Sequence, residues 1–173
     1  MPAVARMRFE MRRETLKFVE HAPVVRATAA EIAVPRERVF EALADAPGWA
    51  AWFPNVRSAE YTSPAPHGRG AIRLAEVAGT TWEEEVIVWD VGRRYGWTVL
   101  HASVPLATAQ VELFELTDTV RGTAIRWTLA LEPRLIARLG APLAEPAIRM
   151  LWLRAMQNLE ALLTGREEPQ ATS

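Results

Sequence analysis

The hydrophobic pattern of the chain changes period twice, and these changes divide it into strands and helices. Alternation predicts a first strand over 24–34, "VVRATAAEIAV". Pro35 then begins a predicted helix, "PRERVFEALAD", because proline at the first helical position loses no hydrogen bond. After "APG" at 46–48, "WAAWF" gives one or two further helical turns. The pattern therefore predicts one strand followed by two short helices.

Period-two alternation then returns for most of the remaining chain. The six expected strands cover 56–62, 70–78, 81–91, 94–101, 107–117 and 123–132. Most of their connections are short and contain Gly or Pro, which is typical of antiparallel meanders. From Pro142 the period is near 3.6, and Gly165 is placed to end the helix. We expect an antiparallel sheet of seven strands and a long C-terminal helix.

The two ends of the chain are less regular than the segment 21–165. In 1–20, Met7, Phe9 and Met11 alternate like a strand, whereas the spacing of later apolar residues suits a helix. These residues are interpreted as an N-terminal arm whose structure the pattern leaves open. The tail 166–173 is polar and is expected to be disordered.

Composition excludes several kinds of site. The formal net charge of -1 argues against nucleic-acid binding, which needs a clustered cationic surface. Without cysteine there is no disulfide, thiolate metal site or cysteine nucleophile. The three histidines lack metal-ligand spacing, so no metal site is expected. We expect no other cofactor either. The chain shows no signal-peptide core and no stretch of membrane-spanning length, so we expect a cytoplasmic protein without membrane insertion.

A sheet of seven strands curls, because strand twist accumulates across it. One long helix covers only part of a curled sheet, so a hollow is expected between the two. The short helices lie at one end of this hollow, and they carry Trp49, Trp52 and, just after them, Phe53. We expect these three rings to close that end with rigid apolar surface.

The order of the segments resembles that of a known superfamily. The segments are "PRERVFEALADAPGWAAWFP", "EEEVIVWDVGRRYGW", "GTAIRWTLALEP" and the closing helix. Over about residues 22–163 they resemble the START-like, helix-grip (SRPBCC) superfamily, in particular its bacterial polyketide cyclase/dehydrase and lipid-transport branch.

This resemblance implies an α+β fold with the long helix over the concave face of the sheet, and 21–165 would form one START-like ligand-binding domain. It also implies a cavity for a hydrophobic or aromatic small molecule. It does not imply one activity, because the superfamily includes carriers, receptors, cyclases and co-chaperone regulators. The rival fold, a cone-shaped domain like that of ketosteroid isomerase, normally begins with helices and ends in strands, the reverse of this chain.

Alternation also assigns side chains to the inner face of the sheet. Along 94–101, Tyr95, Trp97 and His101 share one face, and we place it inside. Along 123–132, Trp127 belongs to the apolar inward set.

Two further strands bring polar groups into the hollow. Placing the bulky Phe114 inside along 107–117 brings Glu112 and Gln110 inside as well. Along 81–91, the side chains alternate between two faces of the strand. The face that carries Trp82 and Glu84 suits the interior better than the opposite face.

One consequence of this assignment is that Ile87 and Trp89 would face outward. Such exposure predicts either a β-bulge that changes the phase of the strand or a cover for that surface. The N-terminal arm or the second subunit of a homodimer could supply the cover.

The inward polar groups suggest general acid/base chemistry. Glu84, Glu112 and His101 are the candidate catalytic residues, because burial raises the pKa of a carboxyl and a histidine exchanges protons near neutral pH. The other reading makes these glutamates solvent-facing, the histidine an ordinary surface or hydrogen-bonded residue, and the tryptophans simple core. The candidate ligand-binding residues are Trp49, Trp52, Phe53, Trp82, Tyr95, Trp97, Gln110, Phe114, Trp127, Trp152 and Met156.

Three functions are compatible with this sequence. The first is binding or carriage of a lipid- or polyketide-like molecule, which needs only the cavity. The second is an aromatase/cyclase or dehydratase, which also needs an ionisable group beside the ligand. The third is a regulatory module that contacts another protein through an outer apolar face. Glutamine at Glu84 or Glu112 separates the first two, because it would remove turnover and leave binding.

Overall fold

The computed structural model describes residues 8–165, apart from the side chains at 136 and 138–144. The helices are α1 (Phe18–His21), α2 (Arg36–Ala44), α3 (Trp49–Trp52) and α4 (Leu135–Thr164). The strands are β1 (Phe9–Glu10), β2 (Val24–Ile32), β3 (Val56–Tyr61), β4 (Ile72–Val77), β5 (Thr80–Asp90), β6 (Arg94–Ala102), β7 (Ala107–Asp118) and β8 (Thr123–Pro133).

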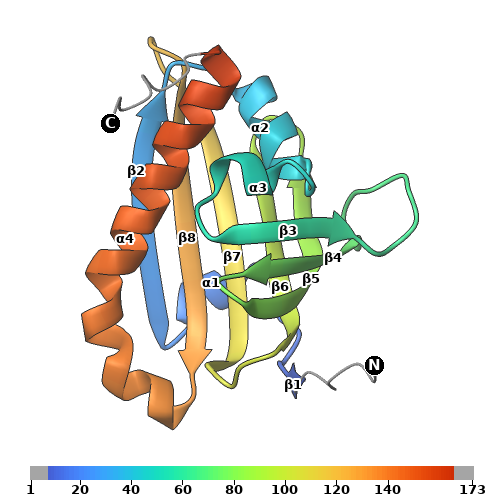
Figure 1. Cartoon of the computed structure of the whole chain (residues 1–173), viewed down its shortest axis with the longest axis vertical. Helices are drawn as coiled ribbons and strands as arrows, with labels where there is room; N and C mark the ends of the chain where they lie inside the picture. Colours follow the sequence, from blue (N-terminus) through green and yellow to red (C-terminus); the bar gives the residue numbers. More distant parts are fainter. Residues whose placement is uncertain (1–7, 166–173) are drawn as a thin grey trace, which may run out of the picture.

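The strands form one antiparallel sheet in the order β2-β8-β7-β6-β5-β4-β3, with β1 paired to β6. In Figure 1, β3 and β4 run across the view while β2 and β8 run along it, so the sheet is strongly curled. Helix α4 lies along β2 and β8, and α2 and α3 close one end. The predicted α+β arrangement, with seven strands in the main path and a long C-terminal helix, is confirmed.

The long helix begins earlier than its period-3.6 pattern predicted. It starts at Leu135 rather than Pro142 and therefore runs through Gly140, Pro142 and Pro146. Proline lacks the N–H that would bond one turn back, which bends a helix. Figure 1 shows such a bend in the first part of α4. The predicted end is confirmed, because Gly165 has the left-handed conformation of a C-cap.

A β-bulge changes the phase of β5. This is one of the two alternatives that the sequence predicted for the surface around Ile87. The register with β6 shifts between Val86 and Val88, and Ile87 is the extra residue. After the bulge, Trp89 packs against the main core, with its ring 5.8 Å from that of Phe40. Ile87 stays on the opposite face of the sheet.

A second irregularity lies in β6 and moves one predicted site residue. Glu83 pairs with His101 and Glu84 pairs with Val99, so that Leu100 is an extra residue. The bulge reverses the alternation, and His101 therefore lies on the outer side while Val99 is fully buried.

The N-terminal arm becomes part of the sheet. The pairing of β6 with β7 ends at Thr98. Beyond it, the N–H of Met11 donates to the Leu100 oxygen of β6, and the N–H of Arg12 donates to the Thr108 oxygen of β7. The arm thus fills the gap where these two strands separate.

The arm also covers the outer face of the sheet. Phe18 of α1 is 2% exposed and packs with Ile87, Val111 and neighbouring apolar residues. Arg13 and Glu85 add an ion pair between the arm and β5, which is partly exposed and contributes little stability. The second sequence alternative, a cover by the arm, is therefore present together with the bulge. The predicted tail and residues 1–7 lie outside the described residues.

Within the part of the chain that the structure describes, no helix has both the length and the apolar character needed to cross a membrane.

Candidate functional site

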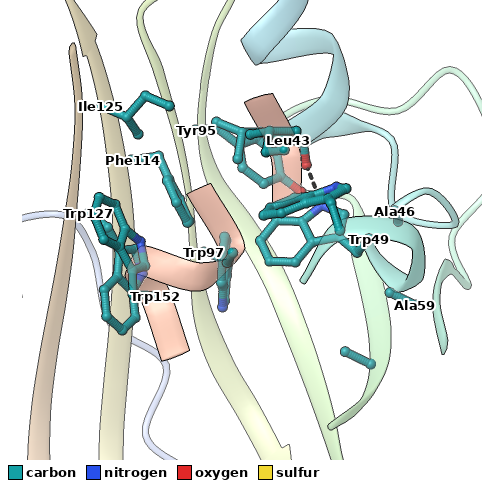
Figure 2. Packing of buried hydrophobic residues seen from close by; sticks show 14 of the residues in the cluster. Leu43, Ala46, Trp49, Ala59, Tyr95, Trp97, Phe114, Ile125, Trp127 and Trp152 are labelled. Atoms are coloured by element: carbon teal, nitrogen blue, oxygen red, sulfur yellow. Dashed lines mark hydrogen bonds between the residues drawn. The ribbon is translucent and has the colours of Figure 1, made fainter. Parts of the chain in front are cut away.

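A continuous row of aromatic rings crosses the interior from α3 to α4 (Figure 2). The ring of Trp49 lies 5.6 Å from that of Trp97, which stacks on Phe114 at 5.8 Å. Phe114 lies 6.4 Å from Trp127, and Trp127 stacks on Trp152 of α4 at 6.1 Å. These contacts fill the deeper part of the expected hollow with side chains.

The remaining apolar and aromatic residues that were predicted to bind the ligand extend this core. Trp52, Tyr95 and Met156 are buried in it, and Phe53 and Trp82 are partly buried against it. The rings after α2 close one end of the interior, as the sequence suggested.

An ion pair lies inside the aromatic core. Arg73 of β4 and Glu84 of β5 occupy paired positions, and both side chains are almost fully buried. The Nε and Nη2 atoms of Arg73 each lie 2.7 Å from Oε2 of Glu84. The guanidinium also lies over the rings of Trp49, at 4.5 Å, and Trp97, at 4.3 Å. Its charge is therefore balanced by one carboxylate and by two ring faces.

Two tyrosines continue the polar contacts toward α2. The hydroxyl of Tyr61 donates to the Ala44 carbonyl at 2.9 Å, so its oxygen accepts from the Tyr95 hydroxyl at 3.0 Å. Nη1 of Arg73 donates to the Tyr95 hydroxyl at 3.5 Å. Burial raises the pKa of both tyrosines, which keeps the two phenols neutral.

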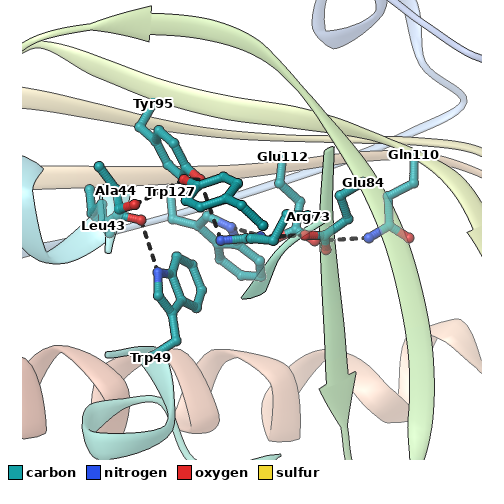
Figure 3. A network of polar contacts seen from close by, with 10 residues as sticks. Leu43, Ala44, Trp49, Arg73, Glu84, Tyr95, Gln110, Glu112 and Trp127 are labelled. Atoms are coloured by element: carbon teal, nitrogen blue, oxygen red, sulfur yellow. Dashed lines mark hydrogen bonds and ion pairs between the residues drawn. The ribbon is translucent and has the colours of Figure 1, made fainter. Parts of the chain in front are cut away.

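Glu112 is the second carboxyl of the interior (Figure 3). Gln110 donates to its Oε1 atom and the indole N–H of Trp127 donates to its Oε2 atom, both at 2.9 Å. Desolvation, followed by the negative charge of Glu84, raises the pKa of Glu112 to about 7. The two hydrogen bonds favour the charged form but are outweighed. Glu112 therefore exchanges its proton near neutral pH.

Burial also raises the pKa of Glu84, and the neighbouring Arg73 opposes that shift. The two glutamates thus have different surroundings, one beside a cation and one beside neutral donors. Such a difference allows two carboxyl groups to take different roles.

An open cleft of about 340 Å³ lies between α4 and the edge of the sheet formed by β2 and β8. Its walls are mainly apolar and aliphatic. They are formed by Val24, Arg26, Ala27, Thr28, Ala29, Trp127, Leu129, Leu131, Glu145, Ile148 and Arg149. Trp127 connects the two parts of the site, because its ring lies in the wall and its N–H binds Glu112.

The structure brings together most of the predicted polar residues. Glu84, Glu112, Gln110 and Trp127 lie in one region of the interior (Figure 3). His101 is not among them. Its Nδ1 atom lies 3.2 Å from Glu83 and 2.9 Å from Arg8 on the outer side of the sheet. Among the described residues, no cluster of three or more His, Asp or Glu could hold a metal ion.

Sequence reasoning missed Arg73 and the cleft residues of β2. The signal for Arg73 was present, because the tight turn at Ala78 and Gly79 sets the register of its hairpin. Counting back from that turn pairs Arg73 with Glu84. A glutamate placed in an apolar interior needs such a cation, so this register identifies Arg73 as the partner of Glu84.

A curled antiparallel sheet that holds a long C-terminal helix beside an apolar cleft is the helix-grip architecture of START-like proteins. A family model for polyketide cyclase/dehydrase and lipid transport proteins matches residues 23–164. The chain belongs to this family.

Curated relatives and solved structures are consistent with this assignment. Uncharacterized proteins of Mycobacterium bovis and Mycobacterium tuberculosis are 28% identical over 152 residues, which is 87% of this chain and 91% of theirs. The Zhui aromatase/cyclase from Streptomyces sp. R1128 superposes with a TM-score of 0.67 at 17% identity, over 87% of this chain and 99% of that one. A START superfamily protein from Mycobacterium smegmatis gives 0.64 at 15% identity, over 83% and 99%. At these identities the structural likeness shows the fold.

Proposed function

We propose that this protein binds an apolar or aromatic small molecule in the cleft between α4, β2 and β8. The observation that carries the proposal is the cleft itself, which Leu129, Leu131 and Ile148 line beside the ring of Trp127. Pockets for small molecules combine such walls with a few polar groups that orient the ligand. The family match to cyclase/dehydrase and lipid-transport proteins supports the same class of ligand.

The expected affinity comes mainly from removing apolar surface from water. Burial of roughly 200 Å² of apolar ligand surface contributes about 5 kcal/mol before the cost of association is subtracted.

The proposal is tested by filling the cleft. Thr28 faces it from β2, directly opposite Trp127 in the β2–β8 register. Thr28→Trp should place an indole in the cleft and remove the small molecule that native mass spectrometry detects on protein purified gently from its own host.

The matched control is Thr117→Trp, at an exposed position of β7 away from the cleft. This variant should keep the ligand. Equal retention by both variants, with unchanged circular dichroism, would place the ligand elsewhere and contradict the proposal.

A second candidate function is cyclase- or dehydratase-type catalysis by Glu112. The observation that favours it is a carboxyl with a pKa of about 7, held by Gln110 and bonded to the cleft-wall residue Trp127. As a carboxylate, Glu112 could remove the proton from a carbon next to a ligand carbonyl. As the resulting acid, it could return that proton to a departing hydroxyl, which leaves as water while a C=C bond forms.

Glu112→Gln separates the two functions, because glutamine keeps the shape of the side chain but cannot transfer the proton. The probe is an aromatic β-hydroxyketone, and its dehydration is followed by absorbance. Under the catalytic reading the variant retains the ligand and loses turnover. If proton removal limits the rate, turnover of the wild type rises as pH increases through about 7. Binding without turnover in the wild type as well would leave the carrier function alone.

A further inference from the structure

We propose that the ligand carries an acidic group, which Arg149 and Arg26 bind at the mouth of the cleft. This inference rests on the proposed binding function and names the chemical class of the ligand. The ligand would be an amphiphile with an apolar or aromatic body and one carboxylate, sulfate or phosphate.

Among the residues that the structure describes, Arg149 is a cation at the cleft without a protein partner. It lines the cleft from α4, one turn after Glu145. Within residues 8–165, no carboxylate lies within ion-pair distance of it and no acceptor takes a hydrogen bond from it. Its guanidinium is therefore available to an anion from outside the chain.

Arg26 lies on the opposite side of the cleft mouth, on strand β2. It pairs with Leu129 in the β2–β8 register, and this places it on the sheet face that α4 covers. Its Nε atom donates to Oε2 of Glu145 at 3.0 Å, so the ion pair spans the cleft from sheet to helix. The side chains of Arg26 and Glu145 are 45% and 52% exposed, and such a pair contributes little stability. A ligand anion can therefore replace Glu145 as the partner of Arg26 at small cost.

The charge at the mouth and the apolar walls together define the ligand. Arg26 and Arg149 carry two positive charges and Glu145 carries one negative charge, which leaves one net positive charge. An anionic group is thus attracted and a cationic one is not. A guanidinium binds a carboxylate, sulfate or phosphate through two parallel hydrogen bonds. The rest of the molecule would lie against Leu129 and Ile148.

The test compares two probes of matched shape, 2-naphthoate and the neutral 2-naphthamide, by isothermal titration calorimetry. The wild type should bind the acid about two- to fivefold more tightly than the amide, and the preference should shrink as salt is added. In Arg149→Gln the two probes should bind about equally, with the affinity for the amide unchanged. Arg38→Gln, at an exposed arginine of α2, is the matched control and should keep the preference.

Glu145→Gln should act in the opposite direction. It frees Arg26, so the acid should bind more tightly while the affinity for the amide stays the same. Equal binding of acid and amide by the wild type, or a preference that survives Arg149→Gln, would overturn the inference and leave the proposed function intact. If neither probe binds and Thr28→Trp also retains the native ligand, the cleft itself is not the site and both proposals fall.

Discussion

Glu84→Gln is expected to lower the free energy of unfolding by about 3–5 kcal/mol, because it leaves the buried charge of Arg73 without its carboxylate. Arg73 is 2% exposed, and the faces of Trp49 and Trp97 beside it cannot accept the strong hydrogen bonds that Glu84 accepts. The measurement is urea denaturation followed by circular dichroism, with the slope of the transition compared between variants.

The companion variants are Arg73→Met and the double variant Arg73→Met/Glu84→Leu. Removing both charges should cost much less than the sum of the single substitutions, because no unpaired charge remains in the core. Asp90→Asn, which breaks an exposed ion pair with Arg94, is the control and should change stability little. Additive effects of the two core substitutions would show that the buried charges do not depend on one another.

Glu112→Gln is expected to become more stable relative to the wild type as pH rises. The pKa of Glu112 is about 7 in the folded protein, against a reference value of 4.5. Below 4.5 the carboxyl is protonated in both states. Between the two values only the unfolded state loses its proton, so wild-type stability falls with rising pH. Above about 7 both states are ionised and the loss is complete at up to roughly 3 kcal/mol.

The measurement is the free energy of unfolding of both proteins between pH 4.5 and pH 8. The free energy of unfolding of the variant should rise relative to that of the wild type up to about pH 7. Above that pH the difference between the two proteins should stay constant. Trp127→Phe provides a second check, because it removes an N–H that favours the carboxylate and should raise the pKa of Glu112 further. Parallel pH curves for wild type and Glu112→Gln would mean that folding does not raise the pKa of Glu112.

Much of the fold could be predicted because alternation and turn residues act locally. The surplus of apolar residues around Ile87 even required a bulge or a cover, and both are present. His101 shows the limit of this reasoning. Nothing in the local alternation of β6 marks the bulge at Leu100, which lies where the arm binds β6 in place of β7. A contact between segments so far apart in the chain leaves no periodic signal.

The position of the cleft was beyond prediction for a different reason. Alternation assigns side chains to a face, but free volume depends on how far side chains from opposite walls reach. The large rings of Trp97, Phe114, Trp127 and Trp152 form a continuous row that fills the centre. The cleft lies at the edge, beside small residues of β2 such as Thr28 and Ala29.

The pairing of β2 with β8 also has a consequence for biosynthesis. Residue Val24 meets Leu131, and the arm at Phe9 meets Ala102, so the earliest parts of the chain contact segments made much later. While the ribosome is still translating, β2 has no neighbour and its apolar residues stay exposed. The sheet can close only once β8 has emerged, so this protein should fold late and comparatively slowly, and it should depend on protection from aggregation until then.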